Sequence, residues 1–141
     1  MSGNKLDATG LYRVSNFYYS IYAKLAFEVA DRTPPYTDEE KEDIGFKIDK
    51  AREVAEYYSK LAKKSLVVDV KMPVARLTKS IEGASETIKN LKVVGKVLDV
   101  VGDLVVIGVT LVSVVTDPTK LGDLPQQVDE LVKHVGEVKA A

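Results

Sequence analysis

The chain of 141 residues contains no cysteine and only one histidine, His134. Without thiols it can form neither a disulfide nor a thiolate metal site, and it has no cysteine nucleophile. A single histidine leaves histidine-based metal sites and serine–histidine pairs without the other residues that they need. We therefore expect no metal and no cofactor, and we interpret His134 as a surface residue near a helix end.

The usual sequence patterns of catalysis and nucleotide binding are absent as well. No GxSxG, GxxxxGK[ST], GxGxxG or HExxH pattern occurs in the chain. Asp99 and Asp103 have the spacing of a carboxylate pair on one helix face. Because a lysine flanks them, a polar helix edge explains them better. We predict that the protein is not an enzyme and has no catalytic residues.

The chain also lacks an excess of charge of one sign. It has 20 basic and 21 acidic residues and a formal net charge of -1. A protein that binds nucleic acid through bulk charge would be strongly basic, so we expect no nucleic-acid partner. The first residues lack the basic start and apolar run of a signal peptide. We expect a cytoplasmic location, while leaderless secretion would leave the same pattern.

What the sequence does contain is typical of a globular helical protein. Hydrophobic residues make up 45% and charged residues 29% of the chain, which predicts a single domain over residues 1–141. Apolar residues recur at steps of three and four and predict helices over residues 7–31, 38–66 and 126–138, with a further one beginning after Pro73. Thr37 and Glu40 fit a capping box for the second helix. We predict an all-α antiparallel bundle of about four helices.

The first predicted helix carries most of the aromatic residues of the protein. Their side chains surround the helix rather than lining one face, so the periodicity leaves two interpretations open. The rings form a packing layer between helices, or they form a surface for a ligand or a membrane interface. The residues of this candidate aromatic surface are Tyr12, Tyr18, Tyr19 and Tyr22.

The most apolar segment lies between residues 93 and 116. No stop signal separates it from the helix after Pro73, so we predict one long, strongly apolar central helix from Pro73 to Thr116. The alternative is a buried strand or hairpin from Leu104 to Val115, because this part is rich in β-branched residues. Residues 66–74 alternate like a strand, but a single strand needs a partner. We interpret them as an extended linker or a frayed helix end.

Polar residues within the apolar segment follow one helical stripe. Their separations of three, four, seven and three place them on a single edge of a helix that is apolar elsewhere. This candidate polar stripe consists of Lys96, Asp99, Asp103, Thr110 and Ser113. The arrangement favours a helix that is buried on most sides and reaches water along the stripe.

The apolar surface of the long helix and the aromatic excess of the first helix exceed what one small bundle covers. We therefore predict a non-enzymatic interaction or scaffold protein with a protein partner, most simply a second copy of itself in a homo-oligomer. The alternative is a soluble bundle that becomes membrane-active, as a pore or by docking on a lipid membrane. A permanent single span is disfavoured, because each charge of the stripe costs about 2.5–3.5 kcal/mol near the bilayer centre.

Overall fold

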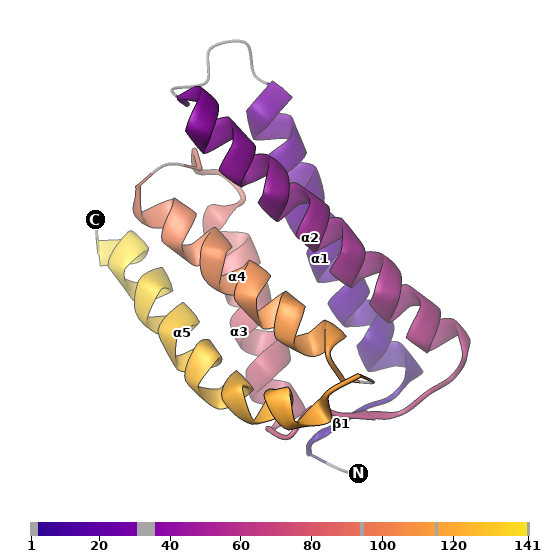
Figure 1. Ribbon diagram of the computed structural model, residues 1–141. Helices are drawn as coiled ribbons and strands as arrows, with labels where there is room; N and C mark the ends of the chain where they lie inside the picture. The colour runs from indigo at the N-terminus through magenta and orange to yellow at the C-terminus, as the bar shows by residue number, and fades with distance from the viewer. Residues whose placement is uncertain (1–2, 31–35, 94, 115, 141) are drawn as a thin grey trace.

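The computed structural model describes residues 3–30, 36–93, 95–114 and 116–140. The described residues form five α-helices: α1 (Ala8–Ala30), α2 (Asp38–Lys63), α3 (Val74–Ile88), α4 (Lys96–Val112) and α5 (Leu124–Ala140). A short 3-10 helix, η1 (Pro118–Asp123), precedes α5, and two strands of two residues each, β1 (Lys5–Leu6) and β2 (Val68–Asp69), complete the fold (Figure 1). The prediction of an all-α protein is confirmed.

Helix α2 follows the sequence prediction closely. The Thr37 hydroxyl accepts a hydrogen bond from the Glu40 backbone amide at 3.1 Å, and the Glu40 side chain accepts one from the Thr37 amide at 3.0 Å. The capping box is therefore confirmed. The helix ends at Lys63 rather than at residue 66. Ser65, two residues after the helix end, has a left-handed φ of 55°.

The prediction of one continuous helix from Pro73 to Thr116 is wrong. Helix α3 ends at Ile88 and α4 begins at Lys96. Gly95 has a φ of 57°, which glycine adopts without strain. A straight helix of that length would measure about 66 Å, whereas a domain of this size has a radius of gyration of about 14 Å. Because the chain turns back between α3 and α4, the apolar faces of both helices reach the same core. The described residues therefore form five helices rather than the predicted four or so.

The alternative of a strand or hairpin from Leu104 to Val115 is also wrong. Helix α4 runs without interruption to Val112, and Val115 lies outside the described residues. Its β-branched residues are accommodated because tertiary packing outweighs their modest helix penalty. Residues 66–74 do contain a strand, since β2 pairs antiparallel with β1 in the register Lys5 with Asp69 and Leu6 with Val68. The interpretation of these residues as only an extended linker or a frayed helix end is therefore wrong, because the partner strand is too short, at two residues, to be evident from the sequence.

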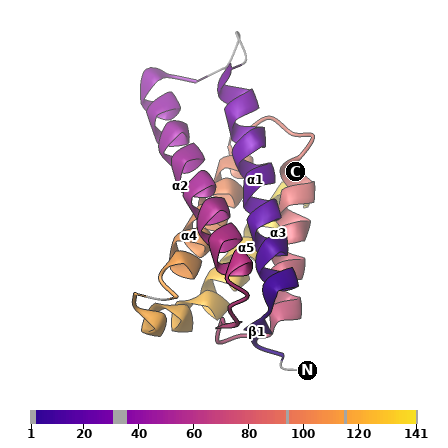
Figure 2. The ribbon, with the colours of Figure 1, turned by 90° about the vertical axis from the view of Figure 1, so that its right-hand side faces the viewer.

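The five helices form a ring around one core. Each packs against the next in the order α1, α2, α4, α5, α3 and back to α1, and α3 also contacts α4. Figures 1 and 2 show that helices adjacent in the chain run in opposite directions. Helix α4 is thus one member of the ring, with an outer side that no other helix of the described chain covers.

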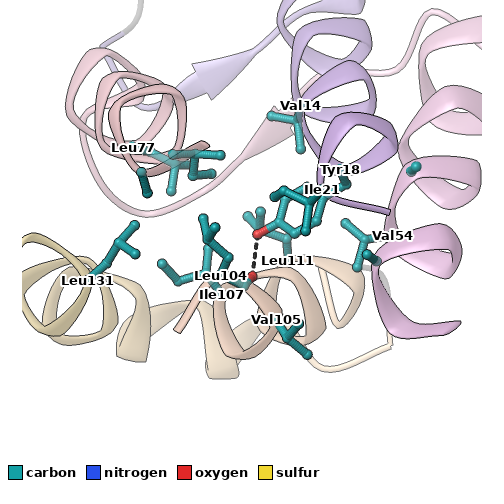
Figure 3. Close-up of a cluster of buried hydrophobic side chains, with 14 of the residues drawn as sticks. Val14, Tyr18, Ile21, Val54, Leu77, Leu104, Val105, Ile107, Leu111 and Leu131 are labelled. Atoms are coloured by element: carbon teal, nitrogen blue, oxygen red, sulfur yellow. Dashed lines mark hydrogen bonds between the residues drawn. The ribbon is translucent and has the colours of Figure 1, made fainter. Parts of the chain in front are cut away.

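Helices α1, α2 and α4 meet in one part of the core. Tyr18 is fully buried there, and its hydroxyl donates a hydrogen bond to the Leu104 carbonyl at 2.6 Å (Figure 3). Tyr58 donates in the same way to the Leu111 carbonyl at 2.8 Å. Gly108 lies on α4 between the two acceptor residues in sequence, and a Cβ atom built on it would come within 2.8 Å of the Tyr18 ring and of Val54. The absence of a side chain at Gly108 sets the distance between the three helices.

Candidate interaction surface

The solvent-facing side of α1 is the first candidate for a functional surface. Six residues follow one another along it at steps of four, three, four, three and four, which is a heptad-like spacing. We call them the outer face of α1: Tyr12, Asn16, Tyr19, Ala23, Ala26 and Ala30. Five of the six are exposed and Ala26 is half-buried; Tyr12 and Tyr19 each remain 41% exposed. Phe27, beside this face, is 76% exposed.

No residue of the outer face of α1 is charged. The helix has three charged residues, Arg13, Lys24 and Glu28; none belongs to this face, and Lys24 lines the groove between α1 and α3. Arg13 forms an ion pair with Glu82 of α3 at 3.3 Å, and Lys24 pairs with Glu28 at 2.8 Å. A solvated helix face is normally rich in charge, so an exposed face without charge is a candidate surface for binding another protein.

The structure divides the four tyrosines of the candidate aromatic surface between the core and the solvent. Tyr12 and Tyr19 lie on the outer face of α1, Tyr22 is half-buried against the core, and Tyr18 is inside it. Burial raises the pKa of the Tyr18 hydroxyl far above its ordinary value, so this phenol stays protonated. The packing interpretation therefore holds for Tyr18, whereas a binding role for the exposed Tyr12 and Tyr19 stays a prediction.

The polar stripe of α4 does not form one exposed edge. Lys96 and Asp99 are exposed, Asp103 and Ser113 are half-buried, and Thr110 is buried with its hydroxyl donating to the Val106 carbonyl at 3.0 Å. One of its residues, Asp103, contacts α5 through His134. The outer side of α4 instead exposes Val106 at 49% and Val109 at 48%, which makes it a second, smaller apolar surface.

His134, expected as a surface residue near a helix end, is partly exposed and in contact with a neighbouring helix. Its ring is half-buried on α5, and Nδ1 donates a hydrogen bond to the carboxylate of Asp103 on α4. Asp103 is therefore paired with His134 rather than with Asp99. Periodicity could not reveal this pair, because the two residues are 31 positions apart and meet only when α5 folds back along α4.

The pair makes stability depend on pH. The hydrogen bond to Asp103 raises the pKa of His134 above its ordinary value of 6.5, and the carboxylates Asp103, Glu137 and Asp99 add to the shift. Burial raises the pKa of Asp103 above 3.8, so its ionised form is also less favourable in the folded protein. Both shifts mean that the folded state binds protons more tightly than the unfolded chain. The stability that His134 contributes to the folded state is fully present at pH values below its ordinary pKa of 6.5. This stability is lost as the pH rises through the raised pKa of His134.

We expect replacement of His134 by glutamine to cost more stability in acid than in base. The difference should stay within about 1 kcal/mol, as for other partly exposed pairs. Urea unfolding of the wild type and the His134→Gln variant, at about pH 5.5 and about pH 8.5, measures it on either side of the histidine titration. A cost that is equal at both pH values would show that the pair does not titrate in this range.

Two surface grooves flank α3. One, of about 490 Å³, lies between α1 and α3 and is lined by Phe17, Ile21 and Ile88 together with Ser85, whose hydroxyl has no hydrogen-bond partner in the described structure. The other, of about 270 Å³, lies between α3 and α5 over Val132 and Val135, with Arg76 and Lys79 at its edge. Arg76 is already paired with Asp129. Neither groove contains a constellation of catalytic groups.

No group of three or more histidine, cysteine, aspartate or glutamate side chains in the described part of the chain could hold a metal ion. None of the helices in these ranges is both long enough and apolar enough to cross a bilayer.

Comparisons with protein-family models, with curated proteins and with solved structures found no match. The chemistry and exposure of its own residues are therefore the basis for a functional proposal.

Proposed function

We propose that this protein is a non-enzymatic interaction protein, an antiparallel helical bundle that associates with a second copy of itself through the outer face of α1. The observation that carries the proposal is an exposed helix face without charge, on which Tyr12 and Tyr19 each remain 41% exposed. Tyrosine is enriched at protein interfaces because its ring buries apolar area while its hydroxyl stays hydrated.

The outer side of α4 supports the proposal less strongly. Its two exposed valines offer less area than the aromatic rings of α1, and exposed Asp99 lies on the same helix. Burying an unpaired carboxylate at an interface costs free energy, whereas none of the six residues on the outer face of α1 carries a charge. We therefore assign the interface to α1 rather than to the apolar segment of residues 93–116.

A pair of matched charge substitutions tests the proposal. The wild type should show concentration-dependent association in sedimentation equilibrium. Tyr19→Lys should abolish it, because the ammonium group would be desolvated at the interface. Val109→Lys, at a comparably exposed position on α4, should leave it unchanged. A wild type that stays monomeric at every concentration would refute the proposal, and dissociation by Val109→Lys alone would move the interface to α4.

Docking on a lipid membrane is the second candidate function. It is favoured by Phe27, whose ring is 76% exposed near the end of α1, close to a face that also carries tyrosine. Tyrosine and other aromatic rings are common at membrane–water interfaces. Flotation of the protein with liposomes of neutral and anionic lipid tests this function, with Phe27→Ser as the matched variant. Absence of binding to both kinds of liposome would eliminate it.

A further inference from the structure

We infer that two copies of the protein pair through α1 in an antiparallel, two-fold symmetric arrangement whose axis passes at the level of Ile21. The inference rests on the proposed self-association and specifies the geometry of the pair. This geometry follows from the order of large and small residues along the outer face of α1. The two tyrosines lie in the first half of this face, and its second half consists of three alanines.

Antiparallel pairing places each large residue against a small one. With the axis level with Ile21, Tyr12 lies opposite Ala30 of the second copy and Tyr19 lies opposite its Ala23. Asn16 then faces Ala26. All six residues of the face find a counterpart, and symmetry repeats each contact on the other side of the axis. Such alternation of large and small side chains lets two helices interdigitate without voids.

Other pairings fit the same residues poorly. A parallel pair would stack Tyr12 on Tyr12 and Tyr19 on Tyr19, and the alanine layers would leave gaps at the other end. Moving the antiparallel pair by one heptad leaves two of the six residues without a counterpart on each helix. The antiparallel arrangement centred near Ile21 also aligns the two helix dipoles favourably.

Asn16 gives this interface a means of fixing its register. It is the one strongly polar side chain within the face, and it would lie next to an alanine of the partner with its amide directed toward water at the rim. A polar residue in an otherwise apolar helical seam selects one register at a cost in stability. The ion pair of Arg13 with Glu82 lies toward α3 with both side chains about half exposed, so it stays hydrated.

The interface extends about 27 Å along α1, from Tyr12 to Ala30. One helix face of this length is at the small end of stable protein interfaces. We therefore expect reversible association rather than a permanent dimer.

Disulfide trapping tests the geometry directly, because the chain has no cysteine of its own. Two single variants, Asn16→Cys and Ala26→Cys, are prepared with tags of different mass, mixed and oxidised. The antiparallel pair brings position 16 of one copy next to position 26 of the other. It keeps the two copies of position 16 about 15 Å apart along the axis, beyond the reach of a disulfide, whose Cα atoms lie within about 7 Å.

The expected product is a mixed disulfide between the two variants, with little or no disulfide when either variant is oxidised alone. Disulfides within each variant alone would show a parallel pair and overturn the inference. A wild type that sediments as a dimer while the variants give no mixed disulfide would also overturn it, yet would leave self-association standing. A monomeric wild type would instead refute the proposed function itself.

A second series keeps the test independent of cysteine chemistry. Ala23→Tyr should weaken association about tenfold, because two tyrosines would then oppose each other in both central layers. Adding Tyr19→Ala should restore it, since each layer again pairs a large residue with a small one. If the second substitution weakens association further, positions 19 and 23 do not face each other and the antiparallel register is wrong.

Discussion

Replacing Gly108 with valine is expected to lower the free energy of unfolding by about 3 kcal/mol or more, the largest loss that overpacking commonly causes. A Cβ atom at this position would come within 2.8 Å of both Tyr18 and Val54, closer than real Cβ atoms lie. The neighbours have no room to yield, because Tyr18 is fully buried and held by its hydrogen bond to Leu104, and Val54 is also buried. Valine adds two further methyl groups at the same point. Urea denaturation monitored by circular dichroism measures the loss.

Gly136→Ala in α5 is the matched control for this substitution. A Cβ atom built on Gly136 meets nothing within 4 Å, so alanine there gains helix propensity without steric cost. We expect the free energy of unfolding to rise by up to about 1 kcal/mol. If Gly108→Val were as stable as the wild type, α1, α2 and α4 could not approach each other as closely as described.

Replacing Tyr18 with alanine is expected to cost about 3–5 kcal/mol, the range for truncating a large aromatic side chain in a core. The ring fills the space between α1, α2 and α4, and its removal leaves a cavity that the surrounding helices close only in part (Figure 3). Tyr18→Phe keeps the ring and removes only the hydrogen bond to Leu104, which should cost about 1 kcal/mol. Chemical denaturation of the two variants separates packing from hydrogen bonding.

Tyr12→Ala provides the comparison on the same helix. Because Tyr12 is exposed in the single copy, we expect its loss to change stability by less than about 0.5 kcal/mol at concentrations too low for association. Equal losses for Tyr12→Ala and Tyr18→Ala would contradict the described orientation of α1. Tyr18 and Gly108 are in contact, so the double variant Tyr18→Ala/Gly108→Val should lose less stability than the sum of the two single losses.

The sequence correctly predicted those parts of the fold that depend on interactions between residues only a few positions apart in the chain. The capping box at Thr37 and Glu40 and the buried positions of α2 follow from local hydrogen bonding and from helical periodicity. The break between α3 and α4 was missed because no proline occurs there, and Gly95 alone does not distinguish a turn from a kink. Whether an apolar segment continues or folds back depends on the core available to cover it.

The candidate surface was predicted only in part for a similar reason. The sequence identified α1 as unusually aromatic, but rings distributed around a helix do not reveal which of them face a neighbour. The heptad-like spacing of the outer face of α1 became informative only when Tyr18 and Ile21 were found in the core on the other side. The contact between Asp103 and His134 likewise required the pairing of α4 with α5.

By itself, the sequence determined that this protein is helical, where α2 begins, and that it has no thiol chemistry and no excess of one charge, because these properties depend on composition and on neighbouring residues. Only the tertiary structure decided which tyrosines lie inside, where the long apolar segment turns, and which helix face is exposed without charge. Those features depend on contacts between residues far apart in the chain, such as Tyr18 with Leu104, which local pattern does not encode.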